Sequence, residues 1–166
     1  MLTRRQMGLA LLAGGTAFVA WRLQGDTGEA AEKFDVTLPE AEWKKRLTSA
    51  QFNVLRRHGT EMPGSSPLDH EKREGVFACA GCDLPLFSSA TKFDSGTGWP
   101  SFWKPLDNAI GTQTDRSMIV ARTEVHCRRC GGHLGHVFDD GPKPTGLRYC
   151  MNGVAMKFMP GGKAAS

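Results

Sequence analysis

Two Cys-x-x-Cys pairs constrain this sequence more than any other feature. Cys79 and Cys82 form the first pair, Cys127 and Cys130 form the second, and 44 residues lie between the pairs. Such a turn places two sulfur atoms on one side of a tight loop, and two turns that meet supply the four thiolates of a tetrahedral zinc ion. Two structural disulfides are the alternative, and one pair alone would also suit a redox motif. We expect one structural zinc ion per chain, because a closed four-thiolate shell leaves no position for a substrate.

Cys150 is the remaining cysteine and has no partner in the sequence. An unpaired cysteine is either an inert buried thiol or a reactive one, and its neighbours favour the second interpretation here. Arg148 and Asn152 lie two residues to either side, so on a strand all three side chains point to the same face. A guanidinium beside a sulfur atom favours the thiolate and lowers the thiol pKa. We therefore predict that Cys150 is a nucleophile on a polar floor.

A second polar cluster lies in the segment 132–142. It contains His133 and His136, two of the five histidines, with Asp140 close after them. Imidazole gives a proton to an oxygen leaving group near neutral pH, and Asp140 is placed to orient or charge that imidazole. Metal binding by the two histidines is the rival interpretation, and histidines that simply face solvent are another.

Trp99 and Phe102 lie in an aromatic segment, 91–103, that is interleaved with Gly and Pro. A segment of this kind usually forms a packed corner. The functional interpretation is an exposed aromatic wall on which Trp99 holds a small apolar group such as a methyl. Phe102 is the second candidate for substrate contact.

The chain from Gly75 onward is predicted to be mainly β. A chain of 166 residues with 40% hydrophobic content suits one core, and 20 Gly and 9 Pro favour turns over long helices. Short apolar runs separated by Gly, Pro and Asp clusters are typical of strands. The expected strands are 75–78, 117–121, 136–138, 147–149 and 154–158. We expect them to form two antiparallel sheets in a distorted barrel.

Two short helices are expected before the strands. The segment 37–40 has the pattern of a capping box with proline at an early helical position. Thr48 and Gln51 form a second capping box. The helix that it opens should stop at His58, because Gly59 suits the position just past a helix end.

The N-terminal segment 1–24 is expected to be a twin-arginine-like signal or an anchor. Arg4 and Arg5 precede a stretch without charge, Met7 to Trp21, which is the order of a basic region and an apolar region in an export signal. We predict a periplasmic protein, with tethering to the membrane through an uncleaved N-terminus as the alternative. The rest of the chain is divided into a linker at 25–37, a folded domain at 38–161 and a tail at 162–166.

The charge distribution argues against a nucleic-acid partner. The formal net charge is +4, but Arg4 and Arg5 of the predicted signal supply half of it. The longest basic run is Lys44 to Arg46, which is too short for the electrostatic footprint of a nucleic-acid binder.

The clusters described above, taken together, resemble the B-type methionine sulfoxide reductases. The matching stretches are HGTE at 58–61, EGVFACAGCDLPLFSSATKFDSGTGWPSF at 74–102, HCRRCGGHLGHVFDDGP at 126–142 and GLRYCMN at 146–152. The resemblance covers residues 38–159. It implies a β-rich fold with a structural zinc ion and reduction of the R epimer of methionine sulfoxide, free or in a protein.

The resemblance also implies roles by position. Cys150 matches the nucleophile, and Trp99 matches the hydrophobic wall for the substrate methyl group. The polar side of the site is formed by His133, His136, Asp140, Arg148 and Asn152. The zinc ligands are Cys79, Cys82, Cys127 and Cys130. The chemistry agrees, because a sulfoxide needs a thiolate at its sulfur and a proton donor at its oxygen, which we expect to be His133 or His136. The products are then a sulfenic acid on Cys150 and a free thioether.

Thr97 departs from the pattern of many members of that family, which carry a cysteine there to resolve the sulfenic acid as a disulfide. If the other four cysteines hold metal, an external thiol must regenerate Cys150 directly. A thioredoxin-like protein or another thiol reductant is the expected partner, and we expect the chain to be a monomer.

Two other functional classes remain open from the sequence. A zinc-knuckle interaction module would keep its binding after Cys150→Ser. A disulfide oxidoreductase would bind no metal and would have a redox-active Cys79 or Cys127.

Overall fold

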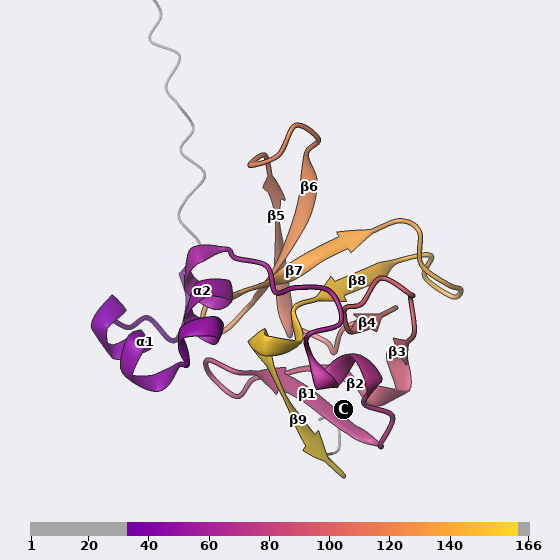
Figure 1. Cartoon of the computed structure of the whole chain (residues 1–166), viewed down its shortest axis with the longest axis horizontal. Coiled ribbons are helices and arrows are strands. Elements are labelled where there is room, and N and C mark those ends of the chain that lie inside the picture. Colours follow the sequence, from indigo (N-terminus) through magenta and orange to yellow (C-terminus); the bar gives the residue numbers. More distant parts are fainter. Residues whose placement is uncertain (1–32, 163–166) are drawn as a thin grey trace, which may run out of the picture. The chain divides into compact units, whose positions relative to one another are not determined.

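The computed structural model describes residues 33–162 (Figure 1). The predicted signal at 1–24 lies outside the described residues, as do most of the predicted linker and tail. Between residues 33 and 162, no helix has the length and apolar character needed to cross a membrane.

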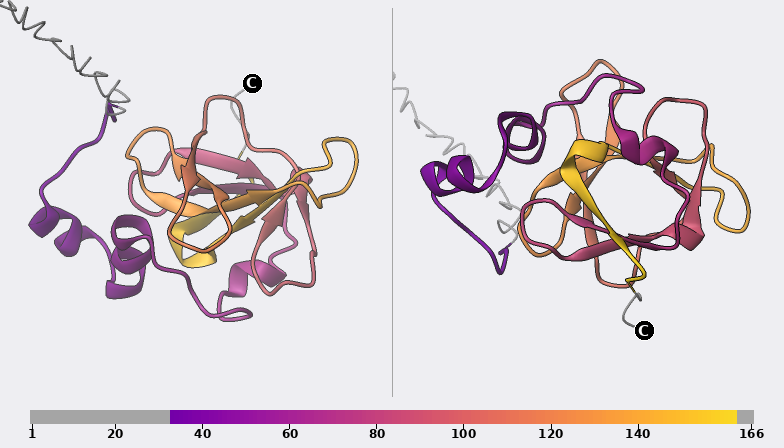
Figure 2. Two further views of the ribbon diagram at one scale, coloured as in Figure 1. Left: turned by 90° about the horizontal axis from the view of Figure 1, so that it is seen from above. Right: turned by 60° about the horizontal axis from the view of Figure 1, so that its bottom comes forward.

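Two antiparallel sheets make up most of the domain. The smaller sheet has the strand order β2-β1-β9, with β1 at Gly75–Cys79, β2 at Pro85–Ser88 and β9 at Met156–Pro160. The larger sheet has the order β3-β4-β8-β7-β6-β5. Its strands are β3 (Lys92–Phe93), β4 (Ser101–Phe102), β5 (Ile110–Asp115), β6 (Arg122–Cys127), β7 (His133–Phe138) and β8 (Arg148–Met151). The strands surround a common interior (Figure 2), so the predicted mainly β class with two antiparallel sheets is confirmed.

Three phenylalanines form the centre of the core. Phe102 of β4 stacks on Phe87 of β2 with ring centroids 4.4 Å apart, and Phe77 of β1 meets Phe102 edge-on at 5.0 Å. All three side chains are fully buried. Since these strands belong to different sheets, the aromatic contacts join the two sheets, and loss of one ring to alanine typically costs about 3–5 kcal/mol.

Helix α2 (Ser49–Arg57) packs against the larger sheet. The predicted capping box is confirmed: the Gln51 backbone N–H donates to Thr48 Oγ1 at 3.2 Å, and the Thr48 N–H donates to Gln51 Oε1 at 3.0 Å. Val54 and Leu55 are buried in the core, and α2 contacts β7. The helix ends as predicted, but His58 itself takes the left-handed conformation (φ 55°) that the sequence assigned to Gly59.

Helix α1 (Glu40–Arg46) begins without the predicted capping box. The residue that precedes it is Pro39, and the Thr37 hydroxyl donates to the Phe34 carbonyl at 3.2 Å instead of capping the helix. Thr37 therefore lies too early in the chain to cap the first turn. Glu40 and Glu42 in that turn still favour a helix start, because carboxylates interact well with its unpaired N–H groups.

The strand predicted at 117–121 is wrong. This run forms the connection between β5 and β6, and Met118, Ile119 and Val120 are exposed. β5 and β6 pair with each other over their whole length, which leaves the apolar run outside the sheet. The described residues also form three short 3-10 helices: η1 (Pro67–His70), η2 (Ser89–Thr91) and η3 (Gly153–Ala155).

Candidate active site

A cavity of about 200 Å³ lies beside strands β7 and β8. Its wall combines apolar and polar side chains with one thiol: Thr60, Trp99, Arg122, Gly135, His136, Phe138, Cys150 and Asn152. A second pocket of about 250 Å³ shares Thr60, Arg122 and His136 with it. The first cavity is large enough for a small substrate group and puts the thiol next to an imidazole.

Cys150 occupies the middle of this wall because of its place in the sheet. It lies on β8 opposite Ser101 of β4 and His136 of β7. A Cβ atom on Gly135 of β7 would lie only 2.1 Å from the Cys150 carbonyl oxygen, so only glycine permits this approach of the two strands. The sheet register therefore sets which side chains surround the sulfur.

Burial raises the pKa of the Cys150 thiol. The Thr97 hydroxyl and the Arg148 charge lower it, but they offset only part of that effect. The sequence-based expectation of a net lowered pKa is therefore wrong for the substrate-free protein. That expectation considered the Arg148 charge and left out the burial of the thiol, which is the larger effect.

Thr97 stands where many members of the resembled family carry a second cysteine. Its Oγ1 lies 3.9 Å from Cys150 Sγ, and it also contacts Ser95 Oγ at 2.8 Å. Ser95 in turn contacts Ser101 Oγ at 2.8 Å. A row of hydrogen-bonded hydroxyl groups thus borders the Cys150 sulfur on the side where the family pattern has a resolving cysteine.

His136 is held by Asp115 and not by Asp140. Its Nε2 lies 2.8 Å from Asp115 Oδ2, and Arg122 Nη2 donates to the same oxygen at 2.7 Å. Hydrogen bonds from Ser117, His136 and Arg122 keep the pKa of Asp115 well below its usual range. Burial lowers the pKa of His136, and the hydrogen bond to Asp115 opposes that lowering. Asp115 is thus the carboxylate partner that the sequence interpretation missed.

His133 is held by a different carboxylate. Its Nδ1 lies 2.6 Å from Glu124 Oε1, and the other oxygen of Glu124 accepts a hydrogen bond from Gln113. Both His133 and Glu124 are buried, and among the residues that the structure describes the His133 Nε2 atom has no hydrogen-bond partner. The two histidine rings lie 5.4 Å apart, but each is bound to its own carboxylate. They therefore do not form the paired metal site that the sequence left open.

Asp140 binds Arg148 with two hydrogen bonds. The Arg148 Nε and Nη2 atoms donate to the two carboxylate oxygens at 2.8 Å each, and the guanidinium lies 4.5 Å from the centre of the Phe138 ring. The prediction that Asp140 orients a catalytic histidine is therefore wrong. Instead Asp140 and Phe138 hold the guanidinium, and its charge still reaches Cys150.

Trp99 is anchored through Glu61, the last residue of the HGTE motif. Its Nε1 donates to the Glu61 carbonyl at 3.2 Å, and the Asn152 Oδ1 atom accepts from the Glu61 N–H at 2.9 Å. The Glu61 carboxylate accepts from the backbone N–H groups of Gly153 and Val154 at 2.6 and 2.9 Å. Burial raises the pKa of Glu61. Glu61 and Asn152 thus tie the Trp99 wall to the end of β8.

Phe102 does not reach the cavity. It is fully buried in the aromatic core, so the prediction of substrate contact is wrong for this residue. Phe138 lines the cavity instead. Phe102 lies on β4 next to Ser101, and strand alternation turns it away from the side that faces Cys150.

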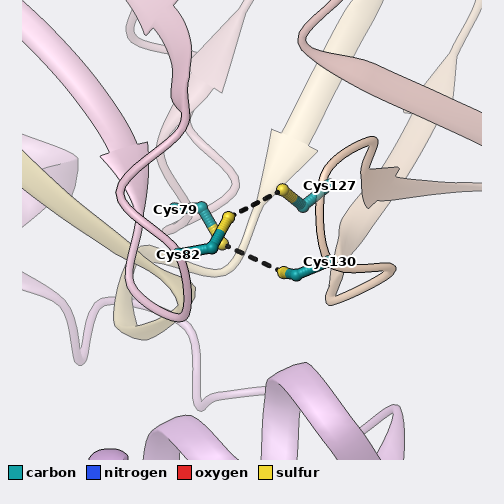
Figure 3. Close-up of side chains that lie close together, drawn as sticks. All are labelled: Cys79, Cys82, Cys127 and Cys130. Atoms are coloured by element: carbon teal, nitrogen blue, oxygen red, sulfur yellow. Dashed lines mark hydrogen bonds between the residues drawn. The ribbon is translucent and has the colours of Figure 1, made fainter. Parts of the chain in front are cut away.

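The four cysteines of the two Cys-x-x-Cys turns form a separate cluster (Figure 3). Sulfur contacts run between the turns, at 3.7 Å for Cys79 and Cys130 and 3.5 Å for Cys82 and Cys127. These distances exclude bonded sulfurs, which lie about 2.05 Å apart, and all five cysteines of the chain are free thiols in the structure. Neither the disulfide nor the redox interpretation of the turns is supported.

The cluster fits a tetrahedral metal ion. All four sulfur atoms lie within 4.8 Å of one another, and zinc–sulfur bonds of about 2.3 Å would place them about 3.8 Å apart. Hydrogen bonds among the crowded sulfur atoms raise the pKa of Cys79 and Cys127 and lower that of Cys82 and Cys130, so all four can be thiolates together only with a cation between them. Gly81 N–H and Arg56 Nη2 point at Cys79 and Cys130 at 3.4 and 3.8 Å, as donors to thiolates do.

Comparison with known proteins gives a consistent result. The SelR domain model matches residues 47–160. The chain is 49% identical over 132 residues to the peptide methionine sulfoxide reductase MsrB of Agrobacterium fabrum, which covers 76% of this chain and 98% of that protein. It is 52% identical over 130 residues to the protein of the same name from Pseudomonas entomophila, covering 78% and 98%. A third similar protein, the chloroplastic reductase B1 of Arabidopsis thaliana, is 52% identical over 134 residues, covering 80% and 66%.

Proposed function

Since the chain belongs to the B-type methionine sulfoxide reductases, a family of oxidoreductases that act on methionine sulfoxide, we propose that it reduces the R epimer through the Cys150 sulfur. The substrate is methionine sulfoxide in an oxidised protein or as the free amino acid. The observation that carries the proposal is the position of Cys150. It is the one cysteine outside the four-sulfur cluster, and it lies in a cavity with Trp99 and His136.

The first step is attack by the Cys150 thiolate on the electrophilic sulfur of the sulfoxide. Oxygen is transferred to the cysteine, so the enzyme sulfur is oxidised to a sulfenic acid and the substrate sulfur is reduced to a thioether. One thiol and one sulfoxide thus give one sulfenic acid and one thioether, and the thiol proton is kept in the products. The raised pKa of the free thiol means that its proton must leave as the substrate binds.

The sulfoxide oxygen needs a proton as it accepts charge. His136 is our first candidate because it lines the cavity opposite Cys150, and Asp115 stabilises its protonated form. His133 is the second candidate, because its free Nε2 atom is buried beside His136. Arg148 stabilises negative charge at the Cys150 sulfur. Asn152 keeps the Trp99 wall in place through its hydrogen bond with Glu61.

Stereochemical choice follows from the two-sided cavity. Trp99 and Phe138 provide an apolar side, whereas His136 and Arg122 provide a polar one. Only one epimer can place its methyl group on the aromatic side and its oxygen on the donor side at the same time. The two-sided cavity thus supports selection of a single epimer, and its assignment as R rests on the family resemblance.

Regeneration is proposed to use an external thiol. A first thiol attacks the sulfenic acid and forms a mixed disulfide with Cys150 and water. A second thiol then releases Cys150 and forms the oxidised disulfide of the reductant. Thr97 at 3.9 Å from the sulfur supports this route, because the position nearest to Cys150 carries a hydroxyl and no thiol. A thioredoxin-like protein supplies both thiols in one molecule.

The four-cysteine cluster is proposed to hold one structural zinc ion. Cys79 ends β1 and Cys127 ends β6, and Cys82 and Cys130 lie in the turns that follow these strands. An ion held by all four ties the smaller sheet to the larger one and leaves no coordination position for substrate. We further propose that residues 1–24 direct the chain to the periplasm and that the domain acts as a monomer, on the sequence evidence given above.

The test is turnover of the two separated sulfoxide epimers with dithiothreitol, for wild type and Cys150→Ser. We expect methionine from the R epimer only and none from either epimer with Cys150→Ser. Equal turnover of both epimers would refute the stereochemical proposal. Undiminished turnover by Cys150→Ser at unchanged metal content would refute the assigned nucleophile.

A further inference from the structure

Three side chains outside the Cys150 cavity converge on one point. His58 comes from the C-terminal end of α2, Glu124 from β6 and His133 from β7. They border the second pocket of about 250 Å³, which shares His136 with the Cys150 cavity. The proposed reaction gives no role to His58, although its imidazole faces the ring of His133, the second candidate for the proton donor.

The donor atoms of these three residues have the spacing of metal ligands. Glu124 Oε1 lies 3.1 Å from His58 Nδ1 and 2.6 Å from His133 Nδ1. One nitrogen or oxygen from each residue falls within 4.8 Å of the others. Zinc bonds to imidazole nitrogen and carboxylate oxygen are about 2.0–2.2 Å long, which puts neighbouring ligand atoms about 3.3 Å apart. Small movements of the side chains are therefore enough to admit an ion.

The buried part of the triad is already fixed in place. The side chains of Glu124 and His133 are 4% and 3% exposed, and Gln113 donates to the second Glu124 oxygen. This hydrogen bond to the oxygen that does not face the triad orients the Glu124 carboxylate, and such support of a ligand increases metal affinity. The His133 Nε2 atom has no hydrogen-bond partner among the described residues, so the contact between Nδ1 and Glu124 is the one that orients the ring.

The third ligand gives access from solvent. The His58 side chain is 60% exposed, while its backbone is fixed by the left-handed end of α2 and by an N–H bond to the Asn53 carbonyl. Two arginines border the pocket: Arg122 is paired with Asp115 at 2.7 Å, and Arg116 lies exposed in the connection after β5. A divalent cation thus meets one carboxylate that is paired with no arginine of the described residues, and two imidazole rings whose Nδ1 atoms face it.

We propose that His58, Glu124 and His133 form a second metal site that binds Zn²⁺ or a similar divalent transition-metal ion and inhibits the enzyme when occupied. An ion on the His133 Nδ1 atom occupies the position of a proton, so the ring cannot become a doubly protonated imidazolium. The added charge also disfavours protonation of His136, whose ring lies 5.4 Å from that of His133. The inhibitory effect rests on the proposed function, whereas the binding does not.

Binding is tested on reduced protein that carries one zinc ion per chain, dialysed against buffered free Zn²⁺ and then analysed for metal. We expect the wild type to take up a second ion and His58→Ala to remain at one. His70→Ala is the matched control, because His70 is an exposed histidine at the end of η1, outside the triad. This variant should bind two ions.

Cys150→Ser separates the triad from a simple thiolate complex. The second ion should still bind to this variant, and its loss would mean that Cys150 holds the ion, which overturns the proposal. The proposal is also overturned if wild type takes up no second ion, or if His58→Ala takes up as much as wild type.

Inhibition is measured in a single turnover without added thiol, because thiols bind zinc themselves. Methionine formation by wild type and His70→Ala should fall at the free Zn²⁺ concentration that loads the second site, relative to each protein without added zinc. For the same loss of rate, His58→Ala should need a free Zn²⁺ concentration at least tenfold higher. Loading without any loss of rate would overturn the inhibitory role. Absence of methionine before zinc is added would instead contradict the proposed function, and the metal analysis would still decide the binding.

Discussion

The domain contains two cysteine environments that differ in almost every physical respect. Four cysteines belong to the two Cys-x-x-Cys turns and face one another across them at 3.5–3.7 Å (Figure 3): Cys79, Cys82, Cys127 and Cys130. Three of these side chains are buried, and Cys82 is half-buried. Cys150 comes from the middle of a strand, has no sulfur neighbour of that kind and faces a cavity.

On the proposed mechanism, this contrast separates four metal-binding thiols from one reactive thiol. In the cluster, each sulfur has sulfur neighbours, so a bound cation would satisfy all four and keep them out of redox chemistry. At Cys150, burial raises the pKa, and the Thr97 and Ser101 hydroxyls and the Arg148 guanidinium counteract only part of that effect. The reactive thiol is thus defined by an open cavity and polar neighbours, not by an unusually acidic resting state.

Replacing Cys150 with serine should give the largest effect on activity. A hydroxyl at this position is far less nucleophilic, so we expect turnover of the R epimer to fall by more than about 10³-fold. Metal content and thermal unfolding should stay within error of wild type, because Cys150 takes no part in the cluster. Steady-state kinetics and metal analysis check both parts. Comparable activity in the variant would remove the contrast between the two environments.

Replacing Cys127 with serine should instead reduce metal content and stability. The variant loses one of four thiolate ligands, so it should bind zinc weakly and unfold at a markedly lower temperature, since a structural zinc site contributes directly to folding. Metal analysis and circular dichroism melting measure the two effects. If the variant retained full metal content and stability, the cluster would not be a metal site.

Asp115→Asn should lower activity by about 10- to 100-fold, the range for an impaired general acid. The carboxylate favours the protonated form of His136, so its removal lowers the pKa of that imidazole further. The decline of kcat/KM on the alkaline side of the profile should therefore move to lower pH. Asp140→Asn is the matched control, because Asp140 binds Arg148 and not a histidine. Identical pH profiles for Asp115→Asn and wild type would show that Asp115 does not act through His136.

Alkylation distinguishes the five thiols directly. With metal bound, iodoacetamide should modify Cys150 alone. Because the pKa of that thiol is raised, the thiolate fraction is small at neutral pH, and the rate should grow about tenfold per pH unit from about pH 6 to 8. Peptide mass spectrometry measures the site and the rate. A rate that is already constant across this range would mean a lowered pKa instead.

Thr97→Cys should change the fate of the oxidised enzyme with the smallest effect on rate, about a fewfold at most. The Thr97 oxygen lies 3.9 Å from Cys150 Sγ, so a sulfur atom there is close enough to form a disulfide after a small movement. After one turnover without reductant, this variant should contain a disulfide between the introduced thiol and Cys150 in place of a sulfenic acid. Thr97→Ser is the control that keeps the hydroxyl. A sulfenic acid that persists in Thr97→Cys would contradict the geometry.

The four-cysteine cluster could be predicted from the sequence, because spacing alone determines how a Cys-x-x-Cys turn presents its two sulfur atoms. The second helix could be predicted for a similar reason, since Thr48 and Gln51 satisfy its first N–H groups locally. The class of fold followed from short apolar runs between Gly and Pro. In each case the information lies within a few residues of the feature.

The carboxylate partners of the histidines could not be predicted, because they depend on strand pairing. Asp115 and Glu124 lie 21 and 9 residues from His136 and His133, and only the β5–β6–β7 register brings them together. Asp140 was chosen for its closeness in sequence, but it follows β7 and turns toward Arg148. The alternation of Arg122 and Glu124 along one strand face was the available signal for polar side chains there.

The stoichiometry of one turnover tests directly whether Cys150 is the single reacting thiol. Reduced, metal-loaded enzyme is mixed with excess R epimer and no reductant, in the presence of a dimedone-type probe that traps sulfenic acid. We expect about one methionine per chain and a single adduct, on Cys150. Two methionines per chain, or oxidation of any cysteine of the cluster in place of Cys150, would contradict it.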